Sequence, residues 1–313
     1  MRRILDLVFR RLLWLAQNPL GCCAVCAGFL ALVWRLAHVD SLVQVGPTEG
    51  FEVLKGSLCS HVAHLYSEVW NDQPPLHTWL LATLFNLFGP SMKTARALAC
   101  GFGLLMCVSA FGVARRTGGA FAGWIACLTL LGSPEALRLC FAAMLEVSAM
   151  GVSLASVWAA FVWENRGGLR WLLLSGCLMG MALQIKFTAA IFVSALLADI
   201  VLFAFCGAST FAAVRWARAA RAMAAWSLAL LAAMGCICAA FQGWSLGALW
   251  FSHAAAAAEL QREGLYTFSM SNLLDCVAWT NVGALFLLLP AALKAWRQFL
   301  FYHVLITRCF WFT

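Results

Sequence analysis

Charged residues are scarce in this 313-residue chain: Asp, Glu, Lys and Arg make up 11% of it, whereas apolar residues make up 64%. A soluble domain is ordinarily about 25% charged and about 45–50% apolar. This deficit excludes a soluble enzyme, a disordered chain and a nucleic-acid-binding protein. The sequence also has no internal repeat and no low-complexity tract. We therefore predict a single transmembrane domain over residues 1–313.

The basic residues give the chain a net charge of +8, and they stand singly or in pairs between apolar runs. This pattern is typical of polytopic membrane proteins, whose cytoplasmic loops hold positive charge. The arginines before the first apolar stretch place the N-terminus in the cytoplasm: Arg2, Arg3, Arg10 and Arg11. That stretch is long and ends without a small-x-small site, which favours a retained helix over a cleaved signal peptide.

The 14 cysteines lie mostly inside apolar stretches, where cysteine behaves as a small hydrophobic residue. Cys23-Ala-Val-Cys26 has the spacing of a redox motif, but it lies in the first hydrophobic segment with no predicted strand beside it. We therefore expect packing residues rather than a redox pair or a disulfide framework.

A spanning helix needs about 20 mostly apolar residues. The sequence predicts an all-α transmembrane bundle of about eight or nine hydrophobic helices. The predicted segments are 12–36, 76–88, 94–114, 120–131, 147–163, 171–185, 187–206, 223–241 and 273–292. If residues 37–75 are external and Arg115 is cytoplasmic, only one of the segments 76–88 and 94–114 crosses the membrane. Either 76–88 is re-entrant or the positive-inside rule fails at Arg115, and the sequence leaves both open.

Two polar stretches, 37–75 and 243–272, are predicted to be external loops. The first holds five of the 13 acidic residues of the chain: Asp40, Glu49, Glu52, Glu68 and Asp72. This concentration favours a functional surface, although a merely solvated loop is the simple alternative. The second is rich in alanine with spaced charges, which predicts a short helix lying on the membrane surface.

Two ionisable residues lie beside or within apolar segments, where charge is costly and often functional. Glu146 directly precedes the segment 147–163 and is expected at the external end, on the same side as Glu49 and Asp72. Lys186 interrupts a long apolar stretch. Structural alternatives are an acid that complements the helix dipole for Glu146 and a snorkelling side chain for Lys186.

Two sets of residues could bind a metal ion. His61-x2-His64-x3-Glu68 would place three ligands on one helical face. Glu49 with Glu146 could hold Mg²⁺ or Mn²⁺, because hard cations take carboxylates. Such spacings are common by chance, so we assign no metal ligand, and a divalent ion stays the alternative cofactor.

One succession of motifs carries a family resemblance. Residues 71–79 read NDQPPLHTW, followed by Leu87-Phe88-Gly89-Pro90-Ser91 and then Ala95-Arg96. This resembles the "QPPL…LFG.S…AR" signature of membrane glycosyltransferases of the C superfamily, such as protein O-mannosyltransferase-like proteins and aminoarabinose transferases. Residues 114–119 are similar to the family's "ARR.GG" and 180–187 to its "G.A…K", so the resemblance covers roughly residues 20–205.

The resemblance implies transfer of a sugar, with inversion, from a polyprenyl-phosphate donor to a lipid, glycan or protein acceptor on the external face. It also implies a bacterial inner (plasma) membrane. We expect Glu49 to act as the general base and Glu146 to orient the acceptor. The expected substrate-binding residues are Lys55, Asp72, Gln73, Arg138 and Lys186.

Two departures from the family bear on activity. The family carries an Asp-Glu pair in its first external loop, and here Thr48 stands in place of the Asp, so that only Glu49 remains. Members also continue with more spans, so we expect a truncated member. The alternatives are an inactive member acting as a membrane scaffold, and a transporter. Transporters place ionisable groups at mid-membrane and often contain inverted repeats, which favours the transferase here.

Overall fold

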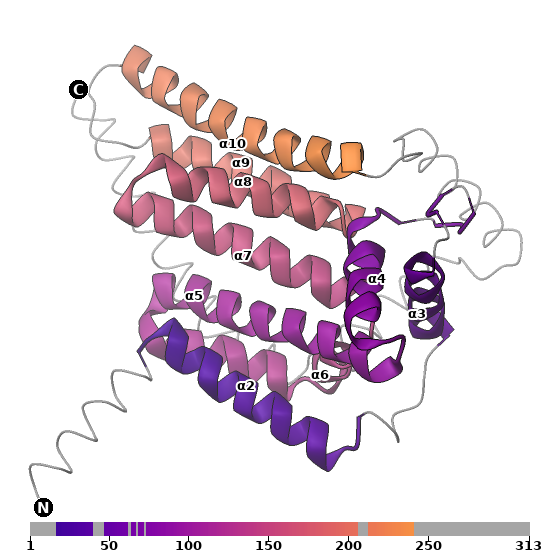
Figure 1. Cartoon of the computed structure of the whole chain (residues 1–313). Helices are drawn as coiled ribbons and strands as arrows, with labels where there is room; N and C mark the ends of the chain where they lie inside the picture. The colour runs from indigo at the N-terminus through magenta and orange to yellow at the C-terminus, as the bar shows by residue number, and fades with distance from the viewer. Residues whose placement is uncertain are drawn as a thin grey trace, which may run out of the picture.

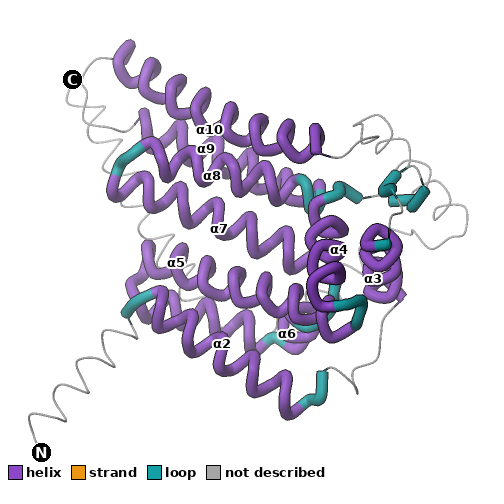
Figure 2. Tube along the Cα trace, viewed as in Figure 1, coloured by secondary structure: helices purple, strands orange, loops and turns teal. Residues whose placement is uncertain are grey.

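The computed structural model describes residues 17–39, 47–61, 64–66, 68–71, 73–205 and 212–240. In these ranges the chain is almost entirely helical, and its only β pairing is an isolated bridge between Leu65 and Val69. Most helices run side by side, while α4 lies across one end of them (Figure 1). Figure 2 shows short loops, among the described residues, between α4 and α5, between α6 and α7, and between α7 and α8. The prediction of an all-α polytopic bundle is confirmed.

Most helices follow the apolar runs of the sequence, but α3 forms within the polar stretch 37–75, which was predicted to be a loop. The helices are α2 (Pro19–Leu36), α3 (Pro47–Ser60), α4 (Leu76–Phe88), α5 (Met92–Gly132), α6 (Pro134–Cys140), α7 (Leu145–Arg166), α8 (Leu169–Leu183), the 3₁₀ turn η1 (Phe187–Ala189), α9 (Ala190–Phe205) and α10 (Ala212–Ala240). Within the described ranges, four helices are long and apolar enough to span a membrane, namely α2, α5, α7 and α10. The protein is therefore an integral membrane protein. The predicted span 273–292 and the predicted loop 243–272 lie outside the described residues.

The element α5 is a helical hairpin rather than one straight helix. Gly119, with φ 76° and ψ −175°, breaks the helix in a conformation that residues with a Cβ rarely adopt. Phe111 and Trp124, on either side of this break, meet edge to face with ring centroids 5.4 Å apart. A Cβ on Gly123 would lie 2.7 Å from the Phe111 ring, so glycine permits this close approach. The two legs correspond to the predicted segments 94–114 and 120–131.

The course of α4 settles the topology that the sequence left open. Since α4 lies across the end of the bundle, the segment 76–88 does not cross it (Figure 1). Arg115, Arg116 and Arg166 line one cavity together with Asn18, so these arginines share one end. We call it the arginine end, and we call the opposite end, which holds α3, α4 and α6, the loop end. A re-entrant 76–88 is one of the two alternatives that the sequence left open, and it agrees with a cytoplasmic arginine end under the positive-inside rule.

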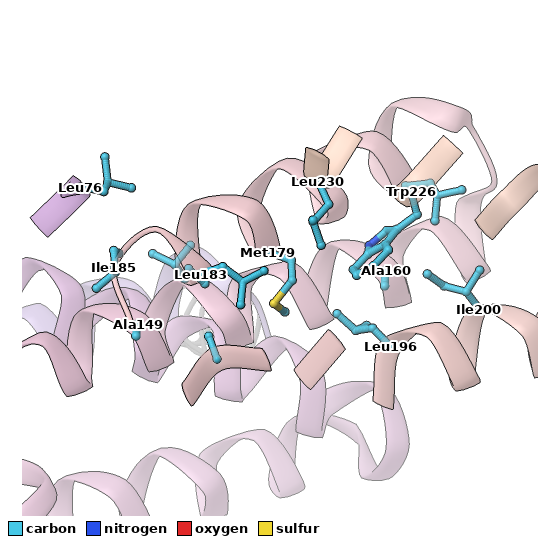
Figure 3. Packing of buried hydrophobic residues seen from close by; sticks show 14 of the residues in the cluster. Leu76, Ala149, Ala160, Met179, Leu183, Ile185, Leu196, Ile200, Trp226 and Leu230 are labelled. Atoms are coloured by element: carbon cyan, nitrogen blue, oxygen red, sulfur yellow. The ribbon is translucent and has the colours of Figure 1, made fainter. Parts of the chain in front are cut away.

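A continuous apolar core fixes α7, α8, α9 and α10 to one another. It extends from Leu76 and Ile185 past Met179 to Ile200 and Trp226 (Figure 3). Small residues let the helices approach closely, as is common between membrane helices. At Gly176, for example, an added Cβ would lie 2.4 Å from the Trp226 carbonyl oxygen of α10. This rigid half of the bundle positions the start of α7 and the end of α8 at the loop end.

Candidate active site

A buried arginine holds Glu49 in the interior of the loop end. Glu49 lies in the first turn of α3 and is 3% exposed. Arg96 of α5 donates from Nε to Glu49 Oε1 and from Nη2 to Oε2, each at 2.9 Å. The backbone N–H of Ala143 donates to the same Oε1 at 3.0 Å, and Arg96 Nη1 donates to the Val39 carbonyl. Glu49 therefore ties α3 to α5 and to the loop before α7 through strong charge-assisted hydrogen bonds.

Lys55, two turns further along α3, holds the following loop against that helix. Its Nζ donates to Glu52 Oε1 at 2.6 Å and to Asn71 Oδ1 at 2.8 Å. The ammonium also lies 4.8 Å from the centroid of the Phe51 ring, and its side chain is 2% exposed. The ammonium group of Lys55 is therefore already bound by partners inside the protein. A contact between Lys55 and a substrate stays a prediction.

The Gln73-Pro74-Pro75 elbow is fixed at both of its ends. The hydroxyl of Tyr66 and the side-chain amide of Asn71 both donate to the Gln73 carbonyl, at 2.7 and 2.8 Å. The Leu76 N–H, at the start of α4, donates to the Gln184 carbonyl at 3.0 Å, and Gln184 follows the last residue of α8. Because proline also fixes φ at two successive positions, the elbow has a defined shape. The side chain of Gln73 is half-buried at this elbow.

Glu146 and Lys186 form an ion pair at the junction of α7, α8 and η1. Lys186 Nζ lies 2.5 Å from Glu146 Oε1, and the two side chains are 24% and 39% exposed respectively. The second carboxylate oxygen, Oε2, is buried and has no hydrogen-bond partner among the described residues. Buried polar atoms are normally paired. This oxygen is therefore free to accept a hydrogen bond from a bound hydroxyl group.

His77, in the first turn of α4, interacts electrostatically with Glu146 of this pair and with Lys55. It is 1% exposed, and in the described part of the chain neither ring nitrogen has a hydrogen-bond partner. The pKa of His77 is lowered to about 4, first by burial and second by the positive charge of Lys55, while Glu146 opposes the shift. His77 is thus neutral at pH 7, and each of its ring nitrogens can donate or accept one hydrogen bond.

The loop end also contains Arg138 and Thr48. Arg138 of α6 is exposed and forms a bidentate pair with Glu135, at 2.9 Å and 2.6 Å. The charges of Glu49 and Glu146 also raise the pKa of Arg138, after the larger effect of Glu135. Thr48 is exposed, next to the buried Glu49. Asp72, a predicted substrate-binding residue, lies outside the described residues.

The predicted histidine metal site is not formed. Because α3 ends at Ser60, His61, His64 and Glu68 do not share a helical face. His61 Nδ1 instead lies 2.9 Å from the Ser57 carbonyl oxygen, and the His64 N–H donates to Glu68 Oε2 at 2.7 Å. In the other predicted set, each acid already has a cationic partner: Arg96 for Glu49 and Lys186 for Glu146. Neither carboxylate therefore needs a divalent ion to balance its charge.

An apolar groove begins at the loop end, between α4 and α5. It has a volume of about 640 Å³, and Leu84 and Phe88 of α4 line one wall. The other wall follows α5 from Lys93 and Thr94 to Leu105. The sequence predicted a lipid groove whose mouth lies near Gln73 and Lys55, but the polar residues of this groove are Lys93 and Thr94. Its floor is wide enough and apolar enough to hold a hydrocarbon chain.

Two residues of this site were not singled out from the sequence. Arg96 belongs to the Ala95-Arg96 motif, and a lone arginine in an apolar segment already indicates a buried partner. His77 follows the two prolines, but nothing in its sequence context shows that α4 buries it. Only the packing of α3 and α4 reveals its environment.

We expect a lower pH to reduce the stability of the folded protein, because the fold buries His77 in its neutral form. Between pH 6.5 and about pH 4 the unfolded chain binds a proton at His77 while the folded chain does not, so stability falls as the pH is lowered. The full loss is about 3 kcal/mol, at about 1.4 kcal/mol per pKa unit. Thermal unfolding of the detergent-solubilised protein between pH 7 and pH 4 measures this slope. His77→Leu should flatten it, whereas His61→Leu, which changes an exposed histidine, should not. Equal slopes for the native protein and His77→Leu would contradict the assignment.

The profile of a membrane glycosyltransferase family of the C superfamily matches this chain. The chain belongs to the dolichyl-phosphate-mannose-protein mannosyltransferase family, whose profile matches residues 72–234, about half of the chain. No curated protein sequence matches the chain.

Two crystal structures of ArnT from Cupriavidus metallidurans have a similar fold. The structure bound to undecaprenyl phosphate matches with a TM-score of 0.53 and 21% identity, over 69% of this chain and 40% of that one. The apo structure matches with a TM-score of 0.51 and 20% identity, over 70% of this chain and 43% of that one. The chain thus spans about two fifths of the length of these relatives.

Proposed function

We propose that this protein transfers a sugar from a polyprenyl-phosphate donor to a hydroxyl group of an acceptor at the loop end, on the external face of a bacterial inner membrane. The observation that carries the proposal is the Glu146–Lys186 pair beside neutral His77, in which one buried carboxylate oxygen is unpaired among the described residues. Membership of the mannosyltransferase family supports the reaction class. The fold shared with an undecaprenyl-phosphate-bound ArnT supports the donor class.

Glu146 is the better candidate for the general base. To act as a base, a carboxylate must receive the proton of the acceptor hydroxyl at a free oxygen. Both oxygens of Glu49 accept hydrogen bonds from Arg96, and Ala143 adds a third, so a proton on Glu49 would disrupt this arrangement. The role of Glu49 as base stays a prediction, but its contacts favour a positioning role. Glu146 Oε2 has no such partner.

The reaction follows from these positions. The acceptor hydroxyl gives its proton to Glu146 Oε2, and the oxygen attacks the anomeric carbon from the face opposite the phosphate. The new glycosidic bond forms as the bond from the anomeric carbon to the phosphate oxygen breaks, and the polyprenyl phosphate leaves with the bonding electrons. Once Glu146 is neutral, the ammonium of Lys186 loses its counter-charge and can stabilise the phosphate. Arg138 supplies a second positive charge on the same surface.

The apolar groove between α4 and α5 is the proposed place for the first part of the isoprenoid chain. Lys93 and Thr94 lie at its polar end and can donate hydrogen bonds to a phosphate. From there the wall formed by α5 descends over three helical turns to Leu105, away from the loop end. A donor in this position would keep its phosphate at the membrane surface and its tail in the apolar part of the bundle.

Thr48 supports a second candidate function, a family member that binds the donor without catalysis. The exposed position next to Glu49 is where the family's acid would stand, and a threonine hydroxyl neither carries a charge nor accepts a proton readily near neutral pH. In this alternative the groove still binds the polyprenyl phosphate, while transfer does not occur.

Introducing the missing acid distinguishes the two candidates. We expect Thr48→Asp to raise the rate of transfer from a synthetic polyprenyl-phosphate sugar by about 10²-fold, because a second carboxylate then faces the acceptor. The measurement is transfer of labelled sugar by purified protein in detergent, with Ser60→Asp on the same helix as the control. If neither the native protein nor Thr48→Asp transfers sugar, while both bind the donor, the binding function is correct.

A further inference from the structure

Four buried cysteines gather where α2 meets the α5 hairpin. Cys22 and Cys26 lie one turn apart on the same face of α2. Cys107 comes from the first leg of the hairpin and Cys127 from the second. Each of the four is at most 1% exposed. Three chain segments thus contribute thiols to one position in the bundle, away from the ionic groups of the loop end.

The sulfur atoms have the separations of a metal coordination shell. Cys22 Sγ lies 3.8 Å from Cys26 Sγ and 3.5 Å from Cys127 Sγ, and all three lie within 4.8 Å of one another. The Cys127 thiol also donates to the backbone carbonyl of Cys107 at 3.2 Å. Four sulfurs at about 2.3 Å from a tetrahedral ion are about 3.8 Å apart. A disulfide needs a separation of about 2.0 Å.

The environment of the thiols is dry and tightly packed. Phe111 belongs to the same buried cluster, and the partly buried Leu104, Trp124 and Leu131 pack against it. Simple packing is the alternative, because a buried cysteine can serve as a small apolar residue. However, α2 buries only four residues, and two of them are Cys22 and Cys26. Thiols therefore make up half of the buried residues by which α2 contacts the bundle.

We propose that Cys22, Cys26 and Cys127 bind one soft metal ion, Zn²⁺ or Cu⁺, which fastens α2 to the α5 hairpin. Soft thiolate ligands select these ions over Mg²⁺ or Ca²⁺. Cysteine binds a metal ion as the thiolate, so binding releases one proton for each coordinating sulfur.

Metal analysis of the full chain, purified in detergent with a thiol-free reductant, tests the proposal. We expect one zinc or copper ion per chain by mass spectrometry of the elements, and the element found identifies the ion. X-ray absorption should give metal–sulfur distances of about 2.3 Å. The double variant Cys22→Ser/Cys127→Ser should lose the ion. The matched control Cys177→Ser/Cys238→Ser changes two cysteines of α8 and α10 and should retain it.

A second measurement on the native chain does not depend on the variants folding. Cobalt added to metal-free protein should produce the thiolate-to-cobalt charge-transfer absorption of a sulfur site, and zinc should abolish it. The proposal is overturned if the native chain takes up neither cobalt nor zinc nor Cu⁺. Equal metal content in the double variant and its control would also overturn it. So would a Cys22–Cys127 disulfide in protein isolated without reductant, since that pair would then be a redox couple.

Discussion

Replacing Glu146 with glutamine is expected to lower the rate of sugar transfer by about 10²–10⁴-fold, the usual contribution of a general base. Glutamine keeps the size of the side chain and can still accept a hydrogen bond from Lys186, but it takes up no proton at neutral pH. The rate is measured with a polyprenyl-phosphate sugar, in native protein or in Thr48→Asp, whichever is more active. Thermal unfolding of the same samples shows whether the protein remains folded.

The matched control for this substitution is Glu135→Gln. Glu135 also lies at the loop end and also pairs with a cation, Arg138, but both side chains are exposed and neither is assigned proton transfer. We expect the control to retain transfer. Full activity of the folded Glu146→Gln protein would show that the base is another residue.

Replacing Glu49 with glutamine is expected to lower the free energy of unfolding by about 3–5 kcal/mol. The substitution removes the buried carboxylate that pairs with the guanidinium of Arg96, and breaking a buried pair in this way typically has that cost. Thermal and denaturant unfolding of the purified protein measure the change. If Glu49 were instead the base, the variant would lose transfer while its stability stayed near the native value.

A double variant distinguishes the effect of the buried charge on stability from the effect of the packing around it. Glu49→Leu/Arg96→Leu removes both charges, so we expect it to be more stable than Glu49→Gln alone. Glu135→Gln again serves as the control, because exposed ion pairs contribute only about 0–1 kcal/mol. A Glu49→Gln protein as stable as the native one would exclude the positioning role.

Hydropathy placed most of the long apolar helices along the chain, but it predicted neither α3 nor α6, and α10 begins before its predicted segment 223–241. The predicted segments 147–163, 171–185 and 187–206 correspond to α7, α8 and α9 within a few residues. The two predicted segments around Gly119 correspond to the two legs of α5. These boundaries were predictable because they depend on the length of an apolar run and on where glycine and arginine interrupt it.

The orientation of α4 was not predictable in the same way. Its 13 residues are as apolar as a spanning segment but too short to cross in an ordinary helix. What decides its course is tertiary: the hydrogen bond from Leu76 to Gln184 and the packing of Gly56 of α3 against Leu81. These partners lie far along the chain or on another helix, so the local hydropathy pattern of the segment 76–88 does not predict them.

In the candidate site, too, the sequence indicated which residues matter but not which contacts they make. The sequence indicated Glu49, Glu146 and Lys186 because charge is costly beside apolar segments, and all three lie at the loop end or at its junctions. Their pairing depends on contacts across the chain: Arg96 is 47 residues from Glu49, and Lys186 is 40 residues from Glu146. The difference between a fully engaged carboxylate and one with a free oxygen is visible only in the structure. That difference decides which acid can accept a proton.

The hydrogen bond between Leu76 and Gln184 has a mechanical consequence for donor access. It joins the first residue of α4 to the end of α8, and so to the rigid core of the bundle. The other end of α4 carries the exposed Leu87 and Phe88 and leads into Gly89. A tilt of α4 therefore pivots about its first turn and displaces its last. The last turns of α4 form the groove wall. An isoprenoid chain that enters from the bilayer would therefore displace the C-terminal end of α4 and leave His77, in its first turn, in place.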